Sequence, residues 1–174
     1  MKTPPSVLPA KKRFGQHFLH QGPVISRIVA AICPQPTDQM LEIGPGLGAL
    51  TQPLLAHLQE LTVIELDKDL IPLLEVQCAS LGRVTIYSAD VLRFDFHLLG
   101  MPEKTWRIVG NLPYNISTPL LFRLLEYRQG IVDMHFMLQK EVVDRIAARP
   151  GDSDYGALKC DDPISLPSKK IVYR

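Results

Sequence analysis

The stretch that decides the fold is residues 40–58, MLEIGPGLGALTQPLLAHL, in which an apolar run passes through a glycine-rich turn into a helical pattern. Residues 40–44 predict a buried strand, because apolar side chains follow one another with a single acid between them. Residues 49–58 have apolar side chains at helical spacing and predict a helix that Pro53 kinks or starts late. A strand that turns directly into a helix is the building unit of α/β proteins.

The same alternation continues along the chain. Ser117 and Thr118 followed by Pro119 are typical of a helix start. Strands alternating with helices predict an α/β fold with a parallel sheet and helices on both faces. The predicted strands are 61–66, 84–89, 106–110 and 131–139, and the predicted helices are 23–33, 67–80, 118–128 and a last one that ends at residue 149, before Pro150 and Gly151.

Composition and charge are those of one soluble domain. The 174 residues are 46% hydrophobic and 21% charged, and the net charge of +1 neither favours nor excludes a nucleic acid partner. Cys33, Cys78 and Cys160 lie far apart, so neither a zinc site nor a disulfide framework is indicated, and we expect a reduced, cytoplasmic protein without metal. The amino terminus has no signal-peptide pattern, and no apolar run reaches the roughly 20 residues that cross a bilayer, so no membrane partner is expected.

Polar or glycine-rich residues follow four successive predicted strands. They are the turn at 42–48, Glu65, Asp90, and the sequence Asn-Leu-Pro-Tyr at 111–114. Ligands of open α/β sheets bind beyond the carboxyl ends of the strands. The four endings therefore predict one binding site at that edge.

The glycine turn allows two kinds of nucleotide ligand. Gly44, Gly46 and Ala49 satisfy a dinucleotide-binding pattern, with Glu65 at the distance of a ribose-binding acid. Glu42 with Gly44, Gly46 and Gly48 also fits an S-adenosylmethionine turn, in which the glycines let the ligand approach the backbone and Glu42 adds negative field.

The two acids that follow have a structural alternative each. Glu65 can accept hydrogen bonds from both ribose hydroxyls, or it is an exposed acid at a strand end. Asp90 can accept from the adenine amine, or it caps the turn that follows.

Residues Asn111, Leu112, Pro113 and Tyr114 favour a methyl donor over a dinucleotide. The Asn111 side-chain oxygen and the Leu112 carbonyl can accept the two N–H bonds of an exocyclic amine, which frees its lone pair for attack. Pro113 stiffens the turn, and Tyr114 offers a ring on which an extruded base can stack. The alternative is a plain turn between a strand and a capped helix.

Five motifs together resemble the ribosomal RNA adenine N6,N6-dimethyltransferases of the KsgA type. They are KRFGQHFL (12–19), EIGPGLGALT (42–51), TVIELD (62–67), GNLPYNISTPLLF (110–122) and MHFMLQKEVVDRIAARPG (134–151). The resemblance implies a Rossmann-like class I S-adenosylmethionine-dependent methyltransferase that dimethylates two adjacent adenosines near the 3′ end of small-subunit rRNA. Its implied partners are this rRNA and the immature small ribosomal subunit, with a role in subunit biogenesis.

The resemblance also implies which residues contact the ligands. Cofactor contacts fall on His17, Leu19, Gly44, Glu65, Asp90 and Asn111. Many relatives have Asn at the position of His17, so an imidazole would have to replace its hydrogen bond if the side chain is used. Basic residues that become phosphate contacts are Lys11, Lys12, Arg13, Lys140 and Arg145.

The resemblance divides the chain into three parts. Residues 1–12 are predicted to be a flexible arm, 13–156 an incomplete methyltransferase domain, and 157–174 a divergent tail. The family's last strands and its C-terminal helical domain have no counterpart, so the strand at 131–139 should have an open apolar edge. We expect cofactor binding to survive in part and catalysis to be strongly impaired.

Two other functions stay open. One is methyl transfer to another amine or amide, such as DNA adenine or a protein glutamine, against which Leu112 and the arm motif argue. The other is a non-catalytic ribosome-assembly protein that binds RNA without turnover.

Overall fold

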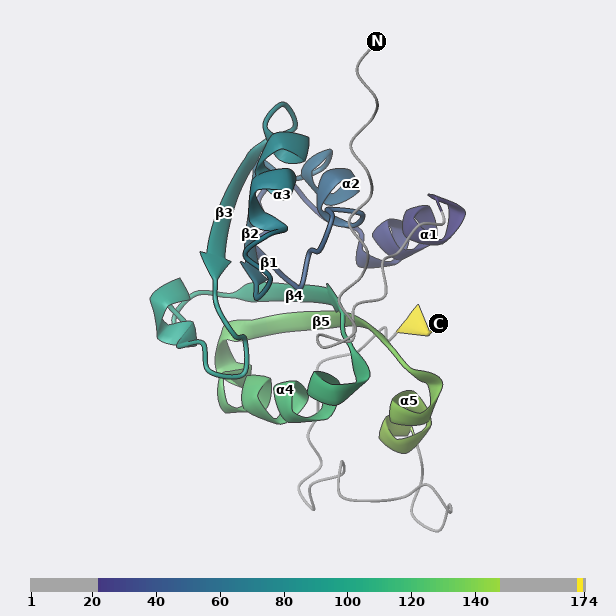
Figure 1. Ribbon diagram of the computed structural model, residues 1–174. Helices are drawn as coiled ribbons and strands as arrows, with labels where there is room; N and C mark the ends of the chain where they lie inside the picture. Colours follow the sequence, from purple (N-terminus) through teal and green to yellow (C-terminus); the bar gives the residue numbers. More distant parts are fainter. Residues whose placement is uncertain (1–21, 148–171, 174) are drawn as a thin grey trace.

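A six-stranded parallel sheet forms the centre of the molecule in a computed structural model that describes residues 22–147 and 172–173 (Figure 1). The strand order is β3-β2-β1-β4-β5-β6, and every neighbouring pair is parallel. The predicted α/β class with a parallel sheet is confirmed. The strands are β1 (Met40–Ile43), β2 (Glu60–Glu65), β3 (Arg83–Ser88), β4 (Trp106–Asn111), β5 (Ile131–Leu138) and β6 (Val172–Tyr173).

Helices cover both faces of the sheet, because successive side chains of each strand point to opposite faces. One core cluster joins α1, α2 and α3 to Met40, Val63 and Val109, and the other joins α4 and α5 to Leu41 and Ile108. The helices are α1 (Gly22–Ile32), α2 (Thr51–Leu55), α3 (Ile71–Cys78), α4 (Tyr114–Glu126) and α5 (Lys140–Ala147), with 3-10 turns η2 (Phe96–Leu99) and η3 (Arg128–Gly130). None of these helices has the length and apolar run that a bilayer span requires.

Three helices begin two or more residues away from their predicted starts. Helix α2 begins at Thr51 and covers only the middle of 49–58, and α3 begins four residues after Asp67, because 67–70 form a hydrogen-bonded turn. The predicted start of α4 at Ser117–Pro119 is wrong. Its N-cap is Pro113, so the helix begins at Tyr114 and Pro119 lies inside it.

The expected open edge of β5 is corrected only at the carboxyl end of the strand. Residues Val172 and Tyr173, from the predicted divergent tail, form β6 and pair in parallel with Met137 and Leu138. The last two residues of β5 are therefore covered on the side that faces away from β4. The exposed side chain of Val132, at 46%, lies at the other end of the strand.

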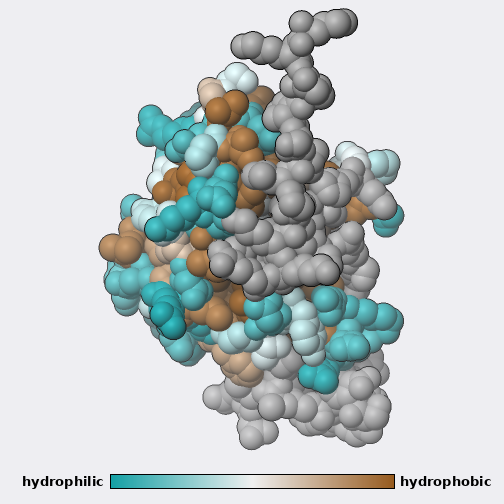
Figure 2. Space-filling model, viewed as in Figure 1, coloured by the Kyte–Doolittle hydropathy of each residue, from teal (hydrophilic) through white to brown (hydrophobic). Residues whose placement is uncertain are grey.

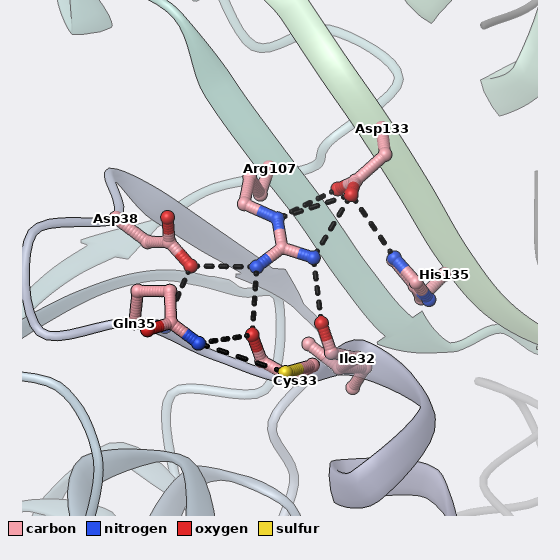
Figure 3. Close-up of polar contacts among 7 residues, drawn as sticks. All are labelled: Ile32, Cys33, Gln35, Asp38, Arg107, Asp133 and His135. Atoms are coloured by element: carbon pink, nitrogen blue, oxygen red, sulfur yellow. Dashed lines mark hydrogen bonds and ion pairs between the residues drawn. The ribbon is translucent and has the colours of Figure 1, made fainter. Parts of the chain in front are cut away.

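A polar cluster around Arg107 ties α1 to the amino ends of β4 and β5 (Figure 3). The Arg107 guanidinium bonds to both oxygens of Asp133 at 2.9–3.1 Å and to Asp38 at 2.6 Å. It also donates to the carbonyls of Ile32 and Cys33, the last residue of α1 and the one after it. This cluster fixes α1 at the edge of the sheet opposite to the predicted site.

Candidate active site

The strand order brings the four predicted strand ends together in the order Asp90, Glu65, the glycine turn and Asn111. Ile43 lies opposite Gly110 in the β1–β4 pair, so Gly44 and Asn111 follow at the same level. The end of β3 is held to that of β2 by a 3.0 Å hydrogen bond from the Ala89 N–H to the Glu65 carbonyl. The predicted meeting of these residues at one edge is confirmed.

The turn between β1 and α2 has a conformation that requires glycine at three places. Gly44, Gly46 and Gly48 have φ values of +69°, +59° and +81°, in the left-handed region where other residues are strained. A Cβ added to Gly44 would meet nothing within 4 Å, so open space lies beside the backbone at the start of the turn. This cradle fits a ligand that approaches the main chain closely.

Glu65 is buried rather than exposed, which removes the structural alternative of an exposed acid. One carboxylate oxygen accepts the Gly46 N–H at 3.0 Å, and the other accepts the Asp67 N–H at 2.7 Å. Burial raises the pKa of Glu65, and these backbone hydrogen bonds oppose that shift. A carboxylate offers about four acceptor positions, so Glu65 can hold the turn and still accept from a ribose hydroxyl.

Glu42 has a different environment from Glu65, although both acids lie on neighbouring strands. Its side chain is 2% exposed, and Oε2 accepts the Thr51 hydroxyl at 2.7 Å. Burial raises the pKa of Glu42 to about 8, so the group is mostly protonated at neutral pH in the free protein. Burial therefore opposes, in the free protein, the negative field that the sequence predicts for Glu42.

Thr51 is a residue of this region that sequence reasoning missed. It is the first residue of α2, fully buried, and its hydroxyl reaches back under the glycine turn to Glu42. The only sequence signal is a hydroxyl residue at the expected helix start, which is usually explained by capping.

Asp90 occupies the position of a turn cap. Its Oδ1 accepts the Leu92 N–H at 3.0 Å, and its carbonyl accepts the Arg93 N–H at 2.9 Å. The capping role left open by the sequence is therefore present. The side chain remains 40% exposed, so a contact with a ligand is compatible with it.

The residues predicted to react lie in and beside a short connection between β4 and α4. β4 ends at Asn111 and α4 begins at Tyr114, so only Leu112 and Pro113 lie between strand and helix. Leu112 is buried, and its N–H donates to the Met137 carbonyl at 3.1 Å. No hydrogen bond to the Leu112 carbonyl is found in the described part of the chain.

Two apolar side chains are exposed next to these strand ends. Tyr114 is 50% exposed at the start of α4, and Leu66 is 48% exposed directly after β2. Apolar side chains reach the surface among hydrophilic ones on the face shown in Figure 2. The exposed ring of Tyr114 is compatible with the stacking role that the sequence predicts.

The predicted contacts outside this edge are placed only in part. Lys11, Lys12, Arg13, His17 and Leu19 lie outside the described residues. Lys140 and Arg145 are exposed on α5, which follows β5 at the same edge, and Lys140 forms an ion pair with Asp144. Among residues 22–147 and 172–173, no group of His, Cys, Asp and Glu side chains is arranged to hold a metal ion.

The fold and the strand ends define a Rossmann-like class I S-adenosylmethionine-dependent methyltransferase domain. Among solved structures, a dimethyladenosine transferase from Plasmodium falciparum aligns with a TM-score of 0.70 and 30% identity, over 80% of this chain and 49% of that one. The 23S rRNA methyltransferase ErmE aligns with a TM-score of 0.65 and 26% identity, over 74% of this chain and 50% of that one.

Residues 7–160 match the family model described as ribosomal RNA adenine dimethylase, and the chain belongs to this family. The ribosomal RNA small subunit methyltransferase A of Marinomonas sp. (strain MWYL1) is 58% identical over 149 residues, which are 86% of this chain and 56% of that protein. The protein of the same name from Pseudomonas syringae pv. tomato is 57% identical over the same shares. The chain thus spans a little over half the length of these relatives. S-adenosylmethionine is the cofactor of the family.

Proposed function

We propose that the chain carries the cofactor-binding and reacting residues for N6,N6-dimethylation of two adjacent adenosines near the 3′ end of small-subunit rRNA. The observation that carries the proposal is the register of β1 and β4, which sets Asn111 beside the glycine turn. The cellular context proposed is small-subunit biogenesis in the cytoplasm, with the immature subunit as partner.

The cofactor fits the cradle described above. We assign its contacts to Gly44, Gly46, Gly48, Glu65 and Asp90, with Asn111 at the reacting end, and to Glu42 below the turn. When bound, S-adenosylmethionine supplies an electrophilic methyl group. His17 and Leu19 are proposed contacts on the basis of the family resemblance alone.

The amine of the target base is oriented by two acceptors. In the first transfer, the Asn111 side-chain oxygen and the Leu112 carbonyl accept the two N6–H bonds, which favours a pyramidal nitrogen with an available lone pair. In the second transfer a single N6–H remains for these acceptors. Pro113 fixes the direction of the carbonyl. Tyr114 holds the extruded base by stacking, which typically contributes about 1–3 kcal/mol. The proton lost from the nitrogen passes to solvent, so no strong base is needed.

Positive side chains complete the proposed RNA contacts. Lys140 and Arg145 are exposed on α5 at the same edge, and Lys11, Lys12 and Arg13 add to them in the arm. Replacing Lys140 and Arg145 with alanine should weaken RNA binding and reduce its dependence on salt. Arg83, exposed on β3 far from the reacting residues, is the matched control position.

The test is transfer of labelled methyl groups from S-adenosylmethionine to undermethylated small ribosomal subunits, followed by separation of the nucleosides. Labelled N6,N6-dimethyladenosine supports the proposal, and Asn111→Ala should abolish the label while Asn115→Ala, an exposed residue of α4, should keep it. Label in DNA or protein instead would contradict it. Salt-sensitive binding to subunits without any label would identify a binder without turnover.

A further inference from the structure

We propose that Glu42 and Thr51 distinguish the sulfonium of S-adenosylmethionine from the thioether of S-adenosylhomocysteine. The inference rests on the proposed use of this cofactor and adds a role in selectivity to the same site. In this inference Thr51 positions the carboxyl group of Glu42, and Glu42 changes its protonation state with the charge of the ligand.

The geometry places this pair at the two ends of the glycine turn. Glu42 lies two residues before Gly44, and Thr51 begins the helix that follows the turn. The 2.7 Å hydrogen bond between their side chains therefore joins the two ends of the glycine turn. Both residues are almost fully buried, so a charge on Glu42 would be weakly screened by water.

Among the described residues, no opposite charge contributes to the environment of Glu42. Thr51 is its hydrogen-bond partner in the described part of the chain. The ionisable groups that face it are Glu65 on β2, which raises the pKa of Glu42, and the buried thiol of Cys78 on α3. A site in which an acid lacks a cation can gain one from a ligand.

Glu65 shows by contrast what makes Glu42 responsive. The backbone N–H groups of Gly46, Leu66 and Asp67 donate to Glu65 and favour its ionised form. Glu42 has a single hydroxyl donor and a pKa near 8 in the free protein. A positive charge in the cradle lowers that pKa, because the ionised form gains an attractive interaction.

The two ligands differ by one methyl group and its positive charge. When the sulfonium enters, Glu42 releases its proton to solvent, and the carboxylate keeps the Thr51 hydroxyl as donor. When the neutral thioether is left after transfer, Glu42 takes a proton back from solvent. The affinity for S-adenosylmethionine should then rise with pH up to about 8, while that for S-adenosylhomocysteine should not.

The experiment is isothermal titration calorimetry with both ligands at pH 6, 7 and 8, in buffers of different ionisation enthalpy. We expect the Kd of S-adenosylmethionine to fall by about tenfold per pH unit between pH 6 and 7, with release of close to one proton, and the Kd of S-adenosylhomocysteine to stay constant. Glu42→Gln should remove the dependence. Thr51→Val should move it to higher pH, because the carboxylate loses its donor, whereas Thr51→Ser should keep it.

Controls separate folding from charge. Glu75→Gln, an exposed acid of α3, should leave both affinities unchanged, and the fluorescence of Trp106 reports folding of each variant. The proton count in the unmodified protein needs no variant at all. A pH dependence shared by both ligands, or one that survives in Glu42→Gln, would overturn the inference. Absence of binding of either ligand at every pH would overturn the proposed function as well.

Discussion

Replacement of Arg107 by methionine removes the centre of the polar cluster at the amino edge of the sheet. The change takes the guanidinium away from the carboxylates of Asp38 and Asp133, of which Asp133 keeps its contact with His135. It also leaves the Ile32 carbonyl at the end of α1 without this donor, whereas the Cys33 carbonyl keeps the side-chain N–H of Gln35. The three charged side chains are only 14–22% exposed, so water compensates incompletely. Methionine fills a similar volume, so the loss is chiefly electrostatic.

The expected loss of unfolding free energy is about 3 kcal/mol. Breaking a buried ion pair by removing one partner costs about 3–5 kcal/mol, and partial exposure lowers that value. Removal of a second pair and of the carbonyl contacts raises it again. Arg107→Lys should lose about half as much, because the ammonium keeps a charge but not the planar fork that bonds to both oxygens of Asp133.

The assay is urea unfolding at pH 7, followed by the fluorescence of Trp106, the single tryptophan. Arg83→Met is the matched control, because its ion pair with Glu60 is exposed and should contribute less than about 0.5 kcal/mol. A loss below about 1 kcal/mol for Arg107→Met would show that the cluster does not hold α1 to the sheet and would refute this reasoning.

One pH titration and two glycine substitutions test the loss of folding stability in acid and the role of the glycine conformations. Hydrogen bonds and ion pairing with His135 and Arg107 outweigh burial and lower the pKa of Asp133 to about 2. The stability that Asp133 contributes is therefore present above pH 4 and should be lost between about pH 4 and 2, which acid titration of the folded state measures. Gly110→Ala should cost about 1–3 kcal/mol in thermal unfolding, because the new Cβ would lie 2.7 Å from a backbone carbonyl of β1, whereas Gly22→Ala meets nothing and should be nearly neutral. Gly48→Ala should weaken S-adenosylmethionine binding through strain at φ +81°, while Gly100→Ala, with φ +77° away from the site, should destabilise the fold without changing the affinity.

The sequence was informative where a local pattern is sufficient. The apolar run before Gly44, the spacing of the three glycines and the polar endings of the strands predicted the sheet and the edge at which the polar residues meet, because parallel strands necessarily present their carboxyl ends together. The motif from Asn111 to Tyr114 could be interpreted as a site for an amine because its four residues are adjacent in the sequence.

Features that depend on distant contacts were not predictable. Arg107 bonds to Asp38, 69 residues away in the chain, and no local pattern marks such a partner. The raised pKa of Glu42 follows from its burial by parts of the chain that the local sequence does not reveal. The start of α4 was misplaced because Ser117 and Thr118 resemble a cap, whereas Pro113 already sets the helix at Tyr114.

The two-residue connection between β4 and α4 has a mechanical consequence. This segment has little conformational freedom. The side chain of Leu112 is buried, its N–H is hydrogen-bonded to β5, and the ring of Pro113 fixes the backbone. Asn111 and Tyr114 thus sit on a rigid frame whose two ends are a core strand and a thirteen-residue helix. Under the proposed function, Asn111 and Tyr114 therefore do not move to extrude the target base. The base must be unstacked through the RNA itself and its other protein contacts before it fits beside these two residues.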